Sequence, residues 1–158
     1  MNIWSRIKKF FKNIKYSIQR IKYGYSSYDT WEMFNHLEHL IPDMLTSLKN
    51  TRIGSAYVDD EFLNKYNIEK FDDVHEQWTE VLNVLIYHWR ECCEDTCSIH
   101  NPAEKDIEHL NYHLIPDDEF KKAFKPYVIL DDKIFQYRKA HKDIAFNMTR
   151  DLFYDLWD

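Results

Sequence analysis

Glycine is so scarce in this chain that its scarcity limits the folds available. Only Gly24 and Gly54 occur among 158 residues, with four prolines. Folds made of many short strands need tight turns, in which glycine supplies positive φ angles. At 44% hydrophobic and 16% aromatic residues, the chain is also too apolar for disorder. The sequence therefore predicts an all-α fold, and two glycines are too few for the phosphate-binding loops of nucleotide-hydrolysing proteins.

The length and the cysteines indicate the broad class of protein. A chain of 158 residues fits one domain with one core. The cysteines Cys92, Cys93 and Cys97 are odd in number and two are adjacent, which favours a reducing compartment over a disulfide framework. No membrane span or signal-peptide pattern is present. We expect a single-domain helical bundle over 1–158, with four to five helices, in the cytoplasm.

The first 28 residues form a basic segment. They contain seven Lys or Arg and no Asp or Glu, whereas residues 29–158 carry fourteen basic and twenty-seven acidic residues. Six apolar side chains recur at helical spacing and fall within about 80° of one another on a helical wheel. They are Ile3, Ile7, Phe10, Ile14, Ile18 and Ile21, with Trp4 and Phe11 widening the stripe. This pattern predicts a basic amphipathic helix over 1–23. Gly24 follows it directly and is suited to end it, because glycine tolerates the left-handed conformation of such a stop.

Three interpretations of this helix are open. The stripe could face the core, with the acidic body as a counter-charge for the lysines, and this is the interpretation we prefer. A basic amphipathic helix can also attach to a partner or to an anionic membrane surface. Its cations could instead bind nucleic acid.

Further helices follow from capping signals and apolar periodicity. Asp29 and Glu32 have the spacing of a capping box, which predicts a second helix from Asp29 to about Asn50, kinked or tightened at Pro42. Residues 50–72 read as an irregular connection with a short helix. A similar signal at Asp73 predicts a third helix to about residue 94, with one apolar face. Its members are Val74, Trp78, Val81, Leu82, Leu85 and Trp89.

The C-terminal third is predicted to end in a long helix. Residues 95–130 read as irregular connections with short helices, one over 103–113 and one between Pro116 and Pro126. The long helix begins near Asp132 and has two apolar seams. The first contains Ile134, Tyr137, Ile144, Met148 and Leu152, with His141 as a core histidine, and the second contains Phe135, Phe146, Phe153 and Trp157. Because two seams need two partners, the helix is central in the bundle or pairs with a second copy through the second seam.

Two groups of side chains are weak metal-binding candidates. His36 and His39 share a helical face with two carboxylates, but this face lies almost opposite the apolar stripe and is predicted to be solvated. His88, Cys92, Cys97 and His100 are ligand types that zinc prefers, but their spacing matches no zinc finger, and the helix would have to break near Asp95. We therefore predict no metal, no other cofactor and no catalytic residues.

A binding site for an anion or a nucleotide is predicted where the basic helix meets the second helix. Cations precede a helix N-terminus there, which offers backbone N–H groups and a positive dipole end, and tyrosines could stack on a base. The residues of this predicted site are Arg20, Lys22, Tyr25, Ser26, Ser27, Tyr28 and Trp31.

Four short motifs follow one another along the chain. They lie at Gly24, Tyr25, Ser26, Asp29 and Trp31; at Ile41, Pro42, Met44 and Leu45; at Trp78, Val81 and Leu82; and at Phe153, Leu156, Trp157 and Asp158. In this order the motifs resemble those of a group of bacteriophage proteins of uncharacterised activity, which show G-Y/W-S/C-x-x-D-x-W leading into I-P-x-M-L, then an E-W-x-x-I/V-L helix and an ending close to F-x-x-L-W-D. The family commonly has an aspartate where this chain has Asn35. The resemblance implies a small helical phage protein and no established activity.

Three classes of function follow from these patterns. The first is a non-catalytic phage accessory protein that sequesters a host protein or a small nucleotide signal, as a counter-defence in the infected cell. The second is a metal-dependent enzyme that uses the His and carboxylate face or the Cys and His cluster. The third is a peripheral membrane or nucleic-acid-binding protein that acts through its basic helix.

Overall fold

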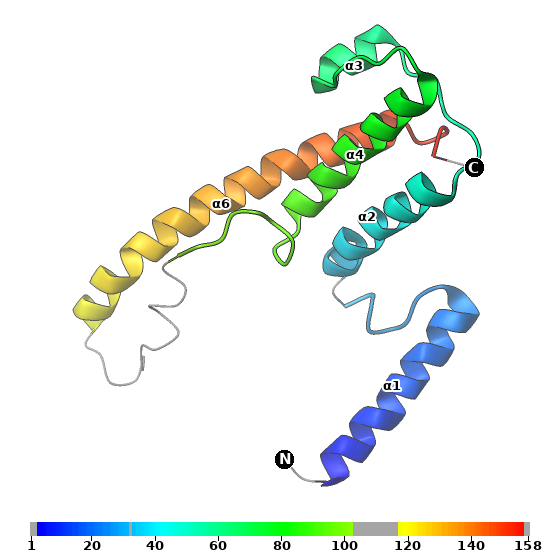
Figure 1. Ribbon diagram of the computed structural model, residues 1–158. Coiled ribbons are helices and arrows are strands. Elements are labelled where there is room, and N and C mark those ends of the chain that lie inside the picture. Colours follow the sequence, from blue (N-terminus) through cyan, green and yellow to red (C-terminus); the bar gives the residue numbers. More distant parts are fainter. Residues whose placement is uncertain (1–2, 32, 103–116, 157–158) are drawn as a thin grey trace. The chain divides into compact units, whose positions relative to one another are not determined.

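The structure is a computed structural model that describes residues 3–31, 33–102 and 117–156 (Figure 1). All regular secondary structure in these ranges is helical, without a strand. The helices are α1 (Ile3–Tyr23), α2 (Met33–Thr51), α3 (Asp60–Tyr66), α4 (Val74–Cys92) and α6 (Asp117–Asp151). The prediction of an all-α fold of four to five helices is confirmed for the part of the chain that the structure describes.

The chain divides into two compact units, Met1–Leu40 and Ile41–Asp158, which we call the N-terminal and the C-terminal unit. The boundary falls inside α2. Each unit is described by itself below.

The start of α2 differs from the prediction. The helix begins at Met33, and residues 26–31 form a turn, because the Asp29 carboxylate accepts hydrogen bonds from Arg20 and from the Ser26 N–H. Asp29 therefore does not cap α2, and Glu32 lies outside the described residues. The helix continues through Pro42, whose carbonyl accepts a hydrogen bond from the Thr46 hydroxyl.

Helices α3 and α4 begin at aspartate caps. The Asp59 side chain accepts from the Phe62 N–H in the short helix α3, which lies within the connection predicted over 50–72. The Asp73 side chain accepts from the backbone N–H groups of His75 and Glu76, as its position in the sequence predicts. Unpartnered N–H groups of each first turn are satisfied in this way.

The core of the C-terminal unit lies between α4 and α6, which pack against each other. Figure 1 shows the two helices side by side. The predicted stripe of α4 is buried, apart from the half-exposed Val74, and α6 contributes Ala145 and Met148, followed by Leu152 just after the helix. Contacts between Glu91 and Tyr137 and between Trp89 and Thr149 show that the helices are antiparallel. Each large apolar side chain buried here contributes about 1.5–3 kcal/mol.

Helix α6 is longer than predicted. It is continuous over 35 residues from Asp117 and passes through Pro126, so the predicted break and the start near Asp132 are wrong. Proline removes one hydrogen bond, which weakens a helix but does not always end it. The first seam faces the core, whereas Phe135, Phe146 and Phe153 of the second seam are exposed. Trp157 and the helix predicted over 103–113 lie outside the described residues.

Candidate functional site

The end of α1 is fixed by a left-handed glycine. Gly24 has φ of 80°, and its N–H donates to the Arg20 carbonyl at 2.9 Å. Such a residue reverses the chain after a helix at little steric cost, as the sequence predicts. The chain then turns back along α1, and the Ser27 N–H and hydroxyl donate to the Gln19 amide oxygen at 3.0 and 3.1 Å.

Asp29 is the centre of this turn. Arg20 donates two hydrogen bonds to its carboxylate, Nε to Oδ2 at 3.0 Å and Nη2 to Oδ1 at 2.5 Å. The Ser26 N–H donates to Oδ2 at 2.7 Å. The Arg20 hydrogen bonds, followed by those of Ser26, hold the pKa of Asp29 well below its ordinary value despite burial. The pKa of Arg20 is raised in turn by its hydrogen bonds to Asp29.

The predicted anion site is therefore arranged around an anion that the protein itself supplies. Arg20 and Ser26 come together, but on Asp29, and the Ser27 donors go to Gln19. Tyr28 joins the turn through its ring, whose centroid lies 5.6 Å from that of Tyr16 on α1.

The remaining residues of the predicted anion site take no part in this network. The ammonium group of Lys22 lies 5.1 Å from the ring centroid of Tyr23. The Tyr25 side chain is exposed, and so is that of Trp31.

The apolar stripe of α1 is exposed. No residue of this helix is buried, and the exposed fractions include 62% for Phe10, 65% for Phe11 and 87% for Ile21. The turn after α1 folds over the polar face of the helix, where Gln19 and Arg20 bind it. The preferred interpretation, a core-facing stripe, is thus not met within the N-terminal unit.

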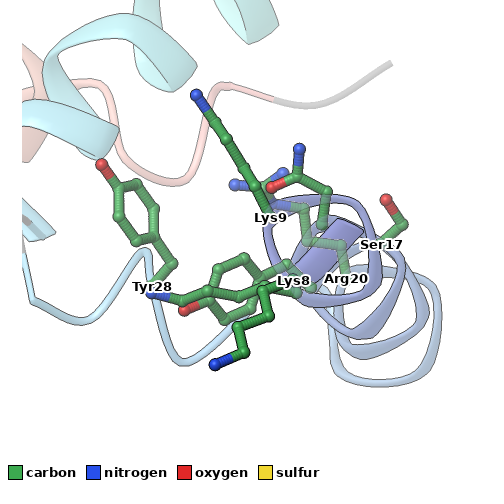
Figure 2. A pocket seen from close by; sticks show the side chains of 8 residues that line it. Lys8, Lys9, Ser17, Arg20 and Tyr28 are labelled. Carbon is green, nitrogen blue, oxygen red and sulfur yellow. The ribbon is translucent and has the colours of Figure 1, made fainter. Parts of the chain in front are cut away.

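A cationic groove runs along the polar face of α1. It has a volume of about 810 Å³ and lies between the helix and the turn (Figure 2). Figure 2 shows Tyr28 on one side and Lys8 and Lys9 on the other. The side chains that matter for its chemistry are Lys8, Lys9, Lys12, Tyr16, Arg20 and Tyr28. The sequence predicts the cations and Tyr28 separately, but not the contact of Tyr28 with Tyr16 that places them around one groove.

A smaller hollow of about 230 Å³ adjoins Arg20 in the same unit. His36 and His39 line it together with Asn35 and Tyr28. The His39 Nδ1 lies 2.8 Å from the Asn35 carbonyl oxygen, one turn earlier on α2.

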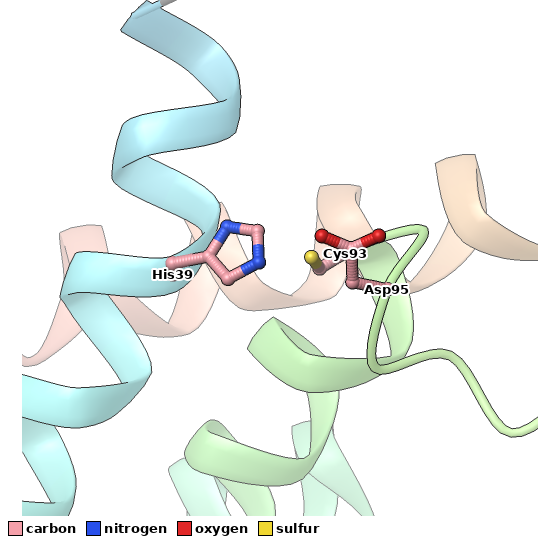
Figure 3. A group of neighbouring side chains, drawn as sticks. All are labelled: His39, Cys93 and Asp95. Atoms are coloured by element: carbon pink, nitrogen blue, oxygen red, sulfur yellow. The ribbon is translucent and has the colours of Figure 1, made fainter. Parts of the chain in front are cut away.

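Figure 3 shows His39 on this helix and Cys93 and Asp95 after the last turn of α4. His39 belongs to the N-terminal unit and the other two residues to the C-terminal unit.

The second predicted metal group is dispersed. Helix α4 ends at Cys92, earlier than Asp95. The Cys92 thiol donates to the Trp89 carbonyl at 3.1 Å, and the Cys97 thiol lies 3.8 Å from Glu91. His88 contacts His141, and His100 is exposed. Among the described residues these four side chains do not gather as one ligand set. Cys92, Cys93 and Cys97 are buried thiols rather than disulfides.

A buried carboxylate joins α4 to α6 in the C-terminal unit. Glu91 accepts hydrogen bonds from the Ser98 hydroxyl at 2.7 Å, the Ser98 N–H at 3.1 Å and the Tyr137 hydroxyl at 2.9 Å. Burial alone would raise the pKa of Glu91, but these hydrogen bonds outweigh it and the pKa is lowered. Burial raises the pKa of Tyr137, so its hydroxyl stays a donor. No sequence pattern indicates this network, because Glu91 interrupts no apolar pattern.

A histidine pair lies next to Glu91. The Nδ1 atoms of His88 and His141 are 2.9 Å apart; Tyr87 packs on both rings, and Tyr137 packs on that of His141. Burial, followed by repulsion from His141, lowers the pKa of His88 to about 4. Burial also lowers the pKa of His141, although Glu91 acts in the opposite direction. His141 is thus a hydrogen-bonded, partly buried histidine, as predicted.

Acid should weaken the C-terminal unit through this pair. The pKa of His88 is about 4 in the folded protein and about 6.5 in an unfolded chain, so the unfolded state binds more protons as the pH falls from 6.5 to 4. Stability is then lost over this range, by about 2 kcal/mol from His88. Urea unfolding at pH 7, 5.5 and 4.5 measures this loss of stability. His88→Asn should flatten the dependence, while the exposed-site variant His100→Asn should keep it, and equal slopes in both variants would contradict the prediction.

Comparison of the chain with protein-family models, with curated proteins and with solved structures finds no match.

Proposed function

We propose that this is a peripheral binding protein that attaches to an anionic lipid surface through α1. The observation that carries the proposal is the exposed apolar stripe on a helix whose segment contains no acidic residue over 1–28. A helix with one apolar and one basic face binds in the plane of the lipid interface.

The apolar side supports this orientation. Its eight side chains are all at least 40% exposed, and they include the aromatic rings of Trp4, Phe10 and Phe11. A continuous stripe of this length is larger than the scattered apolar side chains of ordinary surfaces. Burial of such side chains among lipid chains removes apolar surface from water, which is favourable.

The charges support an anionic surface rather than a neutral one. Seven cations lie within 1–28, and each of the six other than Arg20, which is paired with Asp29, contributes about 1 kcal/mol near an anionic membrane. Lys15 and Lys22 lie beside Trp4 and Phe11 on the helical wheel, so their stems can follow the apolar boundary while the ammonium groups reach the headgroups. None of the helices in the described ranges has the length and hydropathy that a membrane span needs.

Vesicle sedimentation tests the proposal. We expect the full chain to bind vesicles of 30% phosphatidylserine in phosphatidylcholine more tightly than vesicles of phosphatidylcholine alone. Phe10→Ser/Phe11→Ser should weaken this binding at least tenfold, because it removes two exposed rings from the stripe.

The matched control is Phe135→Ser/Phe153→Ser, which removes two equally exposed rings from the C-terminal unit. It should bind vesicles like the unchanged chain. Equal losses in the two double variants, or equal binding to both kinds of vesicle, would refute attachment through α1. Circular dichroism should show the same helix content for all three chains.

The other functions that the sequence suggests stay predictions. Sequestration of a host protein or of a small nucleotide rests on the phage resemblance. A metal-dependent activity rests on the histidine and cysteine groups, and pairing of two copies rests on the exposed second seam of α6.

A further inference from the structure

We propose that the cationic groove on the polar face of α1 binds single-stranded nucleic acid. The inference is independent of lipid attachment, because the groove and the apolar stripe lie on opposite faces of the same helix.

Three lysines supply the charge of the groove. Lys8, Lys9 and Lys12 line it and form no ion pair with any described residue. Arg20 also lines it, but the Asp29 carboxylate neutralises this guanidinium. The groove therefore presents about three uncompensated positive charges to a ligand. Phosphate groups fit such charges, and binding releases the counterions that accompany a polyanion.

Two tyrosines give the groove an aromatic wall. The rings of Tyr16 and Tyr28 are tilted by 38°, with their centroids 5.6 Å apart, and the ammonium group of Lys12 lies 5.6 Å from the Tyr16 centroid. Tyr28 remains 51% exposed, which leaves part of its side chain accessible to a further aromatic group. Any of the nucleic-acid bases can stack on such a ring, and this stacking contributes about 1–3 kcal/mol per base.

The dimensions favour a strand over a mononucleotide. From Lys8 to Arg20 the groove follows α1 for about 18 Å, at 1.5 Å per residue. This is the length of about five nucleotides at the rise of one duplex strand. Lysines occupy one end of this length and the tyrosine pair the other, which is the combination of charge and stacking that sequence-independent single-strand binding uses. A lipid headgroup is the weaker match because the stripe that would lie on the bilayer faces away from the groove.

Fluorescence anisotropy with a fluorescein-labelled thymidylate decamer tests the proposal on the full chain. Lys8→Gln/Lys12→Gln removes two groove cations and should weaken binding at least tenfold at 50 mM salt. The control Lys15→Gln/Lys22→Gln removes the same charge from outside the groove and should stay within about twofold. Three phosphate contacts predict a slope of log affinity against log salt of about −2, and the groove variant should reduce it to about −0.7.

Separate arms test the rings and the kind of anion. Tyr28→Leu should weaken the decamer at least threefold and leave the salt slope unchanged. Unlabelled decamer should displace the probe, whereas polyglutamate and inorganic triphosphate at equal charge should not. Absence of binding, equal losses in the two lysine variants, or equal displacement by polyglutamate would overturn the proposal.

Discussion

Replacing Trp89 by alanine is expected to lower the free energy of unfolding by about 4 kcal/mol. Trp89 is 1% exposed, its ring packs on Phe146 with centroids 4.9 Å apart, and its Nε1–H donates to the Thr149 hydroxyl at 3.1 Å. The substitution leaves a cavity between α4 and α6 and deprives Thr149 of its donor. A loss of this size is a large part of the stability of a small domain.

Urea unfolding followed by circular dichroism measures this loss, and the chain contains a control with the same chemistry. Trp31 is exposed in the N-terminal unit, so Trp31→Ala should change the free energy of unfolding by less than about 0.5 kcal/mol. A loss below 1 kcal/mol for Trp89→Ala would mean that the interface of α4 and α6 is not the core.

The buried carboxylate should give the second large effect. Glu91→Ala removes the acceptor for the Ser98 N–H, the Ser98 hydroxyl and the Tyr137 hydroxyl, and it leaves these donors without their partner. A hydrogen bond to a charged group contributes about 1.5–3 kcal/mol, and water can replace the lost acceptor only at the exposed Ser98, so we expect a total loss of about 3 kcal/mol. Thermal or urea unfolding at pH 7 detects it.

A nearby glutamate provides the comparison. Glu94 is exposed and forms one ion pair with Arg138, at 3.2 Å, so Glu94→Ala should cost no more than about 0.5 kcal/mol. Tyr137→Phe removes one of the donors to Glu91 and should cost about 1 kcal/mol. Equal effects of Glu91→Ala and Glu94→Ala would show that the Glu91 network contributes nothing.

Helix α4 shows what the sequence could predict. Its apolar side chains recur every three or four residues, and Asp73 satisfies the first backbone N–H groups, so face and start follow from local rules. The same applies to the stop at Gly24, where a positive φ is required. Such features depend on residues within one or two turns of each other.

Features that depend on distant partners were missed. Asp29 has the spacing of a helix cap, but an arginine nine residues earlier binds its carboxylate and moves the start of α2 to Met33. Pro126 suggests a helix end, but α6 continues through it. Glu91 gains its role from Tyr137, which lies 46 residues later.

The groove on α1 was only partly predictable. The positions of the lysines and of the apolar stripe follow from the helical wheel. The helical wheel does not show over which face of α1 the next turn folds. That choice depends on the hydrogen bonds from Arg20 to Asp29 and from Ser27 to Gln19. They place Tyr28 against Tyr16 and leave the stripe exposed.

The antiparallel pairing of α4 with α6 also determines the order of events during synthesis. Trp89 meets Thr149, 60 residues later, and the buried side chains extend to Leu152, just after α6. A ribosome must therefore add the last turns of α6 before the apolar face of α4 can be fully covered. Until then part of this face is available to chaperones and to other nascent chains.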